Sequence, residues 1–227
     1  MKKLKIENWE INNIKCSGYA IFDKIFTEEY LNKIQNWYNK RDKNINFKKK
    51  VIINDIPYKN RYLLDVYWDN GEKAIGFIMF NPSFANLNNP DNTIRNTIKY
   101  VNNLNQGYNR IIIQNLFPIR ISGADFVCKY YKEELKKEFL KKYECKINFD
   151  ILPNDVVLCW GKLPQKIPYI DKIIDKLYSK LKEKQKNLYQ ITNDNFQRHI
   201  ASPSINAIKG INHLKLKDIK TIYKFHK

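Results

Sequence analysis

The chain has 227 residues, of which 43% are hydrophobic and 14% aromatic; this is the composition of a globular protein and excludes a disordered one. It has no apolar run long enough for a transmembrane helix, and its basic start, MKKLKIENWEINN, is not followed by an apolar signal core, so we expect a cytoplasmic protein without a membrane partner. The formal net charge of +18 favours a polyanionic partner, although only six of the 41 basic residues are Arg and the abundance of Lys, Asn and Ile is typical of an AT-rich genome.

The cysteines argue against a metal centre. Cys16, Cys128, Cys145 and Cys159 have no CxxC spacing and no neighbouring histidine, which excludes the common zinc and iron–sulfur patterns. Cys159 lies within an apolar segment and is interpreted as a small core residue. We therefore expect no metal and no cofactor. We also expect a monomer.

Along the chain, residues 1–60 are the least regular part. They are predicted to form an N-terminal helical extension packed on the core, with one helix at EEYLNKIQNWYNKR and a charged connector at KNINFKKK. A second domain is predicted over 61–227. Here RYLLDVYW (61–68) alternates as a strand does, DNGEK is typical of a hairpin turn, and AIGFIMF (74–80) is typical of a buried strand.

The rest of the chain alternates helices with buried strands. In PDNTIRNTIKYVNNLNQG, Asp91 or Asn92 suits the N-cap of a helix, Gly107 suits its end, and the apolar face holds Ile94, Ile98, Val101 and Leu104. RIIIQNL is a predicted strand, KYYKEELKKEFLKKY a helix with Tyr131, Leu135 and Phe139 inside, DVVLCW a strand, LPQKIPYIDKIIDKLYSKLKEKQ a helix and NLYQIT a strand. This order predicts a three-layer α/β/α sandwich with a mostly parallel central sheet and the strand 61–68 at an edge.

Ligands of open parallel sheets bind beyond the carboxyl ends of the strands, and polar residues gather at those ends here. The predicted strands end in Asn81-Pro82-Ser83, in Asn115 and in Trp160-Gly161, and the last one leads into TNDNFQRHIASPS. Each group also has a structural interpretation. Asn81-Pro82 suits a helix-entry turn, Asn115 suits pairing with loop carbonyls, Trp160-Gly161 suits core packing before a helix, and His199 suits an exposed loop.

The order NPS, Asn, VVLCWG and a late H…SPS resembles that of the uracil-DNA glycosylase superfamily over residues 74–205. FNPSFANLNNPDNTIRN with QNLFPIR also resembles a bacterial domain-of-unknown-function family, number 1643. The first resemblance implies a glycosylase-like fold and a set of roles. Asn81 would position water, Asn115 would read the edge of a base, and His199 would stabilise charge on the departing base.

The same resemblance places further residues around a flipped nucleotide. Phosphates would be held by Ser83, Arg198, Ser202 and Ser204, a base would stack on Phe84 or Phe117, and Pro82, Trp160 and Gly161 would line the substrate. The chain departs from the superfamily pattern in two places. The first motif has Asn81 where the most active members have Asp, so Asp91 is the candidate general base, and HIASPS replaces the HPSP-type loop.

These residues suggest a DNA glycosylase-like hydrolase that flips a damaged or modified base, such as a modified base of phage DNA, out of duplex or single-stranded DNA. Hydrolysis of an N-glycosidic bond needs a donor at the departing base and a placed water, and it needs no metal. Two alternatives stay open: a non-catalytic nucleic-acid or nucleotide-binding module, favoured by Asn81 in place of Asp, and a hydrolase of free nucleosides or nucleotides.

Overall fold

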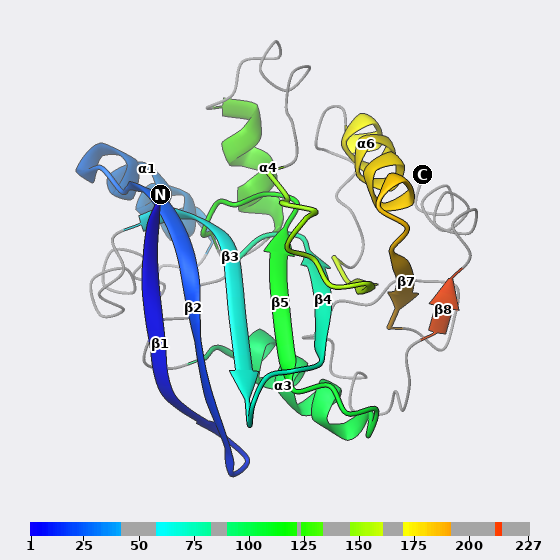
Figure 1. Cartoon of the computed structure of the whole chain (residues 1–227). Coiled ribbons are helices and arrows are strands. Elements are labelled where there is room, and N and C mark those ends of the chain that lie inside the picture. The colour runs from blue at the N-terminus through cyan, green and yellow to red at the C-terminus, as the bar shows by residue number, and fades with distance from the viewer. Residues whose placement is uncertain are drawn as a thin grey trace.

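The computed structural model describes residues 1–41, 58–82, 90–121, 124–133, 146–160, 170–191 and 212–214. They form a sheet whose strands have the order β1-β2-β3-β5-β4-β6-β7-β8 (Figure 1). The strands are β1 (Lys2–Ile11), β2 (Ile14–Ile25), β3 (Tyr58–Trp68), β4 (Ala74–Met79), β5 (Arg110–Asn115), β6 (Asp155–Leu158), β7 (Asn187–Gln190) and β8 (Asn212–Leu214). The described helices are α1 (Glu28–Arg41), α3 (Asn92–Asn103), α4 (Ala124–Glu133) and α6 (Ile170–Glu183).

The sheet is mixed. Strand β4 is parallel to β5 and to β6, and β6 is parallel to β7. The pairs β1–β2, β2–β3, β3–β5 and β7–β8 are antiparallel. The predicted mostly parallel, glycosylase-like α/β/α sandwich is therefore wrong, because antiparallel strands flank the parallel centre on both sides.

Much of the antiparallel part is an N-terminal hairpin of β1 and β2 that the sequence analysis missed. Asn12 and Asn13 turn the chain with φ angles of 51° and 67°. Positive φ at both turn residues is typical of a tight hairpin, and Asn adopts it more readily than most residues. A register shift between Ile6 and Trp9 interrupts the alternation that would have revealed β1.

Residues 1–60 are thus not mainly helical, although the helix expected at EEYLNKIQNWYNKR is confirmed as α1. The predicted boundary between two domains at residue 60 stays a prediction. Strand β2 pairs with β3 along most of its length, from Cys16↔Trp68 to Ile25↔Tyr58, so the hairpin belongs to the same sheet as the rest of the chain.

The predicted hairpin of residues 61–68 and 74–80 is also wrong. Strand β3 lies between β2 and β5, not at an edge, and β4 lies on the far side of β5. The turn after β3 therefore feeds a crossover, with Gly71 at a φ of +66°. Local turn chemistry predicted the turn correctly, but it does not decide which strand becomes the neighbour.

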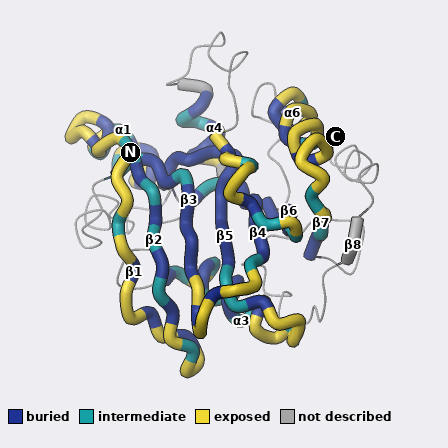
Figure 2. Tube along the Cα trace, viewed as in Figure 1, coloured by how far each residue is buried: buried dark blue, intermediate teal, exposed yellow. Residues whose placement is uncertain are grey.

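Two core clusters lie on the two faces of the sheet. Ile75, Phe77 and Met79 of β4 belong to one cluster, and the alternate residues Ile78 and Phe80 belong to the other. The first cluster contains the buried side of α3, and the second contains residues of α1, α4 and α6. We call these the α3 face and the opposite face. Figure 2 shows that the central strands are buried and that β1 is more exposed.

The predicted helices are present where the structure describes them, although α3 ends at Asn103 with Leu104 as its C-cap and not at Gly107. Asp91 is the N-cap of α3, and Ile94, Ile98 and Val101 are buried as expected. Tyr131 is buried on α4, whereas Leu135 and Phe139 lie outside the described residues. Strand β8 was not expected.

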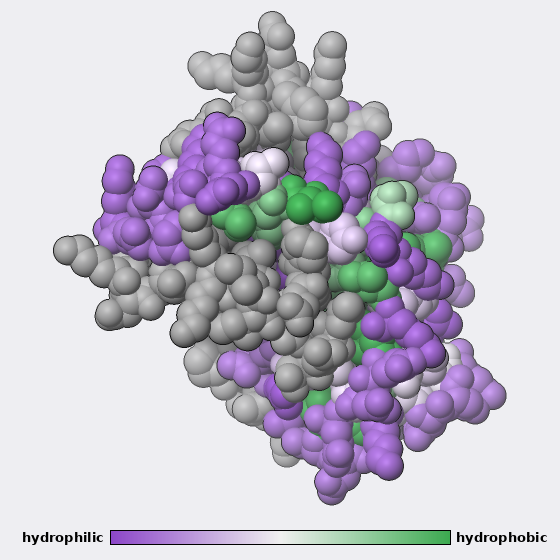
Figure 3. Space-filling view, turned by 90° about the vertical axis from the view of Figure 1, so that its left-hand side faces the viewer, coloured by the Kyte–Doolittle hydropathy of each residue, from purple (hydrophilic) through white to green (hydrophobic). Residues whose placement is uncertain are grey.

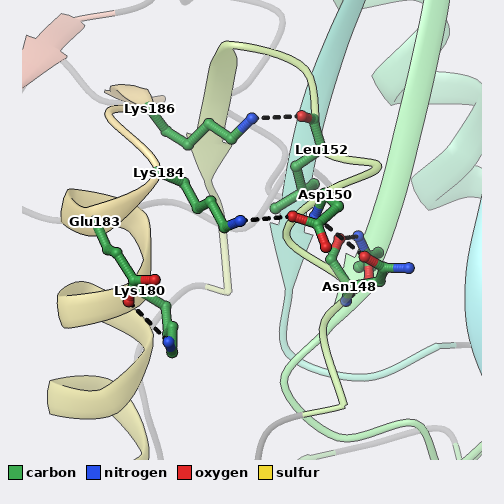
Figure 4. A network of polar contacts seen from close by, with 8 residues as sticks. Asn148, Asp150, Leu152, Lys180, Glu183, Lys184 and Lys186 are labelled. Carbon is green, nitrogen blue, oxygen red and sulfur yellow. Dashed lines mark hydrogen bonds and ion pairs between the residues drawn. The ribbon is translucent and has the colours of Figure 1, made fainter.

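Polar contacts fix the loop before β6 to the end of α6 (Figure 4). Lys184 Nζ donates to Asp150 Oδ1 at 2.7 Å, and Lys186 Nζ donates to the carbonyl oxygen of Leu152 at 2.7 Å. On the other side of the loop, Gln114 Nε2 donates to the carbonyl oxygen of Asn148 at 2.8 Å, and the Asn148 amide donates back to Gln114 Oε1 at 2.7 Å. These contacts link α6 and β5 to the loop between them.

Candidate functional site

The carboxyl ends of β4, β5 and β6 meet at one edge of the sheet. Met79 is the register partner of Asn115 in β5, and Ile78 is the partner of Leu158 in β6. The pairing continues just beyond the strands, where the amide of Leu116 donates to the carbonyl oxygen of Met79 at 2.9 Å. The chain segments that follow these strands therefore start side by side, as the sequence analysis expected for a ligand site.

Asn115, at the end of β5, has a side chain that the fold does not use. It continues the alternation of Ile111 and Ile113, which belong to the α3-face core, so its side chain lies on that face. The residue is 5% exposed, and neither Asn115 Nδ2 nor Asn115 Oδ1 has a hydrogen-bond partner. The expected alternative, pairing with loop carbonyls, is not what the structure shows. A buried amide without partners costs about 1–3 kcal/mol, so this side chain is one that a ligand would satisfy.

Asn81 lies just beyond the end of β4 and is half-buried. Asn81 Nδ2 donates to the carbonyl oxygen of Ile121 at 2.6 Å and to that of Ile119 at 3.4 Å. It also donates to the carbonyl oxygen of Pro82 at 3.1 Å. The residue Pro82 is itself buried. The amide group thus joins the end of β4 to the segment after β5. With Nδ2 held in this way, the side-chain oxygen is the part of Asn81 left to accept a hydrogen bond from a ligand or water.

Asp91 combines a structural role with an unused oxygen. Its Oδ1 accepts from the backbone amide of Ile94 at 2.9 Å, which makes it the N-cap of α3. Its Oδ2 is enclosed and has no hydrogen-bond partner. The charge of Asp91 acts on the guanidinium of Arg61, so Asp91 offers a carboxylate oxygen near Arg61 at the positive end of the α3 helix dipole.

Two buried arginines, which the sequence analysis did not single out, lie at the same edge. Arg61 is 2% exposed and Arg120 is fully buried. The amide of Arg61 donates to the carbonyl oxygen of Pro118 at 2.8 Å, and that of Arg120 donates to the carbonyl oxygen of Lys59 at 2.9 Å. An antiparallel bridge pairs Asn60 with Ile119 between them. Alternation about this bridge places both arginine side chains on one side of the two segments.

That side is the α3 face. Ile119 and Ile121 belong to the core of the opposite face, so the intervening Arg120 lies on the α3 face. Its guanidinium lies over the ring of Phe22, an α3-face residue, at 5.5 Å from the centroid. Arg61 is the register partner of Phe22. In the sequence, Arg61 stands at the start of RYLLDVYW and Arg120 stands within the apolar stretch LFPIRI.

Burial and charge set the pKa values of the two guanidinium groups. Burial lowers the pKa of Arg61 to about 10, against the charge of Asp91, which raises it. Burial lowers the pKa of Arg120 to about 9, and the charge of Arg61 lowers it further. Arg61 therefore interacts electrostatically with both Asp91 and Arg120. We call Arg61, Asn81, Asp91, Asn115 and Arg120 the carboxyl-edge cluster.

The predicted aromatic residues are placed elsewhere. Phe117 is fully buried in the core of the opposite face, with its ring centroid 5.2 Å from that of Phe80 and 4.6 Å from that of Tyr131. Trp160 is 5% exposed in the same core. The structure thus does not bring these rings to the α3 face with Asn115. Roles for Phe117 and Trp160 in substrate binding stay predictions.

The other predicted site residues lie outside the described part of the chain. These residues are Ser83, Phe84, Gly161, Arg198, His199, Ser202 and Ser204. Their expected roles in phosphate binding, base stacking and charge stabilisation stay predictions.

Other features bear on metals, thiols and membranes. Among the described residues, no three His, Cys, Asp or Glu side chains are grouped as metal ligands would be. Cys159 is fully buried in the α3-face core, as expected of a small hydrophobic residue. None of the described helices has the length and apolar character needed to cross a bilayer. The coloured surface in Figure 3 is mostly hydrophilic, with smaller hydrophobic areas between.

Comparison with known proteins gives one match. The model of a family described as protein of unknown function (DUF1643) matches residues 61–203, a range that contains the whole carboxyl-edge cluster. No curated protein matches the chain, and no solved structure does.

Proposed function

The chain belongs to the DUF1643 family of proteins of unknown function, and from that premise and the geometry of the carboxyl edge we propose that it hydrolyses the N-glycosidic bond of a damaged or modified base in DNA. The observation that carries the proposal is Asn115. Both polar atoms of its amide are buried and unpaired at the carboxyl end of β5. A nucleobase edge offers an acceptor beside a donor, which is the complement of a planar amide.

The proposed roles follow from the atoms each side chain has left. Asn115 Nδ2 donates to a carbonyl oxygen of the base, and Asn115 Oδ1 accepts from a neighbouring ring N–H. Asn81 uses its amide group on the carbonyl oxygens of Ile121 and Ile119, so its oxygen is directed to water. Among the described residues, Asp91 Oδ2 is the carboxylate oxygen that is enclosed and unpaired, which makes it the acceptor for the proton of that water.

The reaction balances without a metal or cofactor. The bond between C1′ of the sugar and the base nitrogen breaks, and its electron pair leaves with the base. Water adds to C1′ and gives its proton to Asp91, while the negative charge on the base is stabilised by the donors around it. The order of the strand-ending motifs, which resembles that of the uracil-DNA glycosylase superfamily, and the net charge of +18 also favour the proposal. The mixed sheet gives the resemblance no support.

One observation favours a second function, that of a non-catalytic nucleic-acid or nucleotide-binding module. The amide of Asn81 bonds to backbone carbonyls and supplies no base of its own. A protein that kept Asn115 but lost catalysis would bind the same ligand and release no base.

The test is an incubation of the protein with duplex and single-stranded DNA that carries uracil, mismatched bases or phage-type modified bases. Alkali cleavage reveals abasic sites. We expect product on at least one substrate, and we expect Asn115→Ala and Asn81→Ala to lose it. Asn103→Ala is the matched control, because Asn103 is an exposed amide at the far end of α3 and its loss is expected to change nothing.

Two outcomes would change the assignment. Binding of the panel that weakens steeply with salt and depends on Asn115, with no abasic product, would replace the hydrolase by the binding module. Binding and product that are unchanged in both variants would remove the carboxyl edge as the site.

A further inference from the structure

The carboxyl-edge cluster holds more positive charge than its acidic group balances. It contains the guanidinium groups of Arg61 and Arg120 and a single carboxylate, that of Asp91. Arg61 is 2% exposed and Arg120 is fully buried, so water screens neither charge well. A buried charge is costly unless an opposite charge and hydrogen bonds compensate for it. Among the described residues, Asp91 is the carboxylate whose charge acts on Arg61, so an anion beside Arg61 would add to this compensation.

The two arginines differ in how far the fold has already engaged them. Arg120 Nη1 donates to the carbonyl oxygen of Tyr58 at 2.8 Å, and its guanidinium lies over the ring of Phe22. Arg61 interacts with Asp91 through charge, but its Nε is enclosed without a hydrogen-bond partner. The contacts with Tyr58 and Phe22 thus hold the charge of Arg120 in place, whereas the Nε of Arg61 can still donate a hydrogen bond.

Arg61 lies on the same side of the sheet as Asn115, the residue proposed to contact the base. Its backbone is bonded to Pro118, three residues beyond Asn115, and its side chain lies on the same face of the sheet as Asn115 and the N-terminus of α3. Guanidinium groups and helix N-termini both favour a phosphate over other anions, because they present several N–H donors to its oxygens. The combination suits an anion attached to the ligand whose base meets Asn115.

We propose that Arg61, supported by the fixed charge of Arg120, binds a phosphate group of the nucleotide whose base Asn115 contacts. This inference rests on the proposed base-binding role of the site, and it adds a subsite outside the Ser and Arg198 positions that the sequence suggested. The phosphate comes either from a free nucleotide or from the sugar–phosphate backbone, and binding experiments separate the two sources.

The experiment measures binding by calorimetry and needs no turnover. One arm compares a deoxynucleoside with its 5′-monophosphate. The other compares a single-stranded trinucleotide with the same trinucleotide whose linkages are neutral methylphosphonates. We expect the phosphate to add about tenfold or more in affinity in one arm, as charge-assisted bidentate bonds do, and the arm in which it appears identifies the source. Equal affinities within both pairs would overturn the proposal.

Variants assign the effect to Arg61. In Arg61→Met, the phosphate-bearing ligand is expected to fall to the affinity of its uncharged counterpart, which itself stays within about twofold of wild type. Arg61→Lys keeps the charge but loses the planar fork, so it should retain part of the difference. Lys184→Met removes one positive charge from the end of α6 and is expected to bind all ligands as wild type does. A full phosphate effect in a folded Arg61→Met would overturn the assignment.

A measurement on the wild type alone covers the case in which Arg61→Met does not fold. At low millimolar concentration and constant ionic strength, inorganic phosphate is expected to raise the thermal midpoint more than chloride does, with a saturable dependence on concentration, because it binds the folded state. Equal midpoints in the two salts would count against the subsite.

The outcomes for this subsite and for the proposed hydrolase are distinguishable. Phosphate binding that depends on Arg61, with no abasic product from any DNA, keeps the subsite and removes the hydrolase. Abasic product that Arg61→Met forms with unchanged kcat and KM keeps the hydrolase and removes the subsite.

Discussion

The polar side chains at the two ends of the central strands differ in whether they have hydrogen-bond partners. At the amino end, Asp65 Oδ1 accepts from Arg110 Nε at 2.9 Å and Asp65 Oδ2 accepts from Arg110 Nη2 at 2.6 Å. Asp155 accepts from Tyr108 Oη at 2.8 Å and from Asn187 Nδ2 at 2.9 Å. These five residues, which we call the amino-edge group, form two hydrogen-bonded sets, one around Asp65 and one around Asp155.

At the carboxyl end, Asn115 is buried with both amide atoms unpaired, Asp91 keeps one unpaired oxygen, and Arg61 keeps an unpaired Nε. The difference teaches what each end is for. Hydrogen bonds within the amino-edge group are expected to stabilise the fold, whereas the unpaired atoms of Asn115, Asp91 and Arg61 are the ones that the proposed ligand would bind. Variants at the two ends should therefore separate stability from function.

The largest effect is expected from Asn115→Leu. Leu has nearly the shape of Asn but no polar atoms, so product formation, or binding if the protein is a binding module, should fall about a hundredfold or more. Because the amide is unpaired, the free energy of unfolding should stay the same or rise by about 1 kcal/mol. Urea denaturation and the DNA panel measure the two quantities. A variant that loses both stability and function would show that Asn115 supports the fold.

Arg110→Met should have the opposite profile at the amino end. The substitution removes the ion pair of the Asp65 carboxylate, whose side chain is 2% exposed, although the hydrogen bond from Tyr19 stays. Because the Arg110 side chain is itself 37% exposed and water screens the pair in part, we expect a loss of about 2 kcal/mol in the free energy of unfolding. Ligand binding by the folded protein should stay at the wild-type level. A selective loss of binding would contradict the division between the two ends.

Tyr108→Phe tests the amino-edge group by pH. Burial, with the hydrogen bond to Asp155 and its charge, raises the pKa of Tyr108 well above its ordinary value. An acid whose pKa is raised by folding adds stability that is fully present below its unfolded pKa of about 10 and is lost as the pH rises toward its folded pKa. At pH 7 the wild type should be more stable than the variant by about 1 kcal/mol, the value of one hydrogen bond.

Above pH 10 the wild type should lose this advantage, so urea denaturation curves of the two proteins should converge as the pH rises. A constant difference between the two proteins from pH 7 to pH 11 would show that Tyr108 ionises equally in the folded and unfolded states.

Lys184→Met is expected to have the smallest effect. Lys184 and Asp150 form an ion pair with side chains 41% and 78% exposed, and exposed pairs of this kind contribute little. No measurable change is expected in the free energy of unfolding or in binding. A clear loss of stability would mean that the network in Figure 4 holds the loop before β6 in place more strongly than its exposure indicates.

The sequence predicted local structure well where a strong pattern stood alone. The helix EEYLNKIQNWYNKR, the N-cap at Asp91 and the buried strand RIIIQN were all found where expected. It failed on pairing. The hairpin of residues 61–68 and 74–80 was wrong because β5 inserts between the two strands, a choice that depends on contacts distant in the sequence.

For the site, the sequence predicted Asn81 and Asn115 at the ends of strands and Asp91 at the cap of a helix, as the structure has them, and it gave Phe117 a base-stacking role that stays a prediction. Phe117 directly follows Leu116 after β5, yet it is fully buried on the opposite face. Arg61 and Arg120 could not be recognised as buried from the sequence, because an arginine in a short segment does not itself reveal its burial. Only the pairing of residues 59–61 with 118–120 places them together.

The sequence by itself thus determined α1, α3 and the strands β3 to β7, since caps, turns and periodicity act over a few residues, but it did not reveal β1, β2 or β8. The tertiary structure alone decided that the sheet is mixed, that Asp65 and Asp155 find partners at one end of it, and that the other end leaves the Asn115 amide, one oxygen of Asp91 and the Nε of Arg61 without a hydrogen bond. The reason is physical: whether a polar atom has a partner depends on what packs beside it, and at this edge the neighbours come from β3, β4, β5 and the start of α3, which lie far apart along the chain.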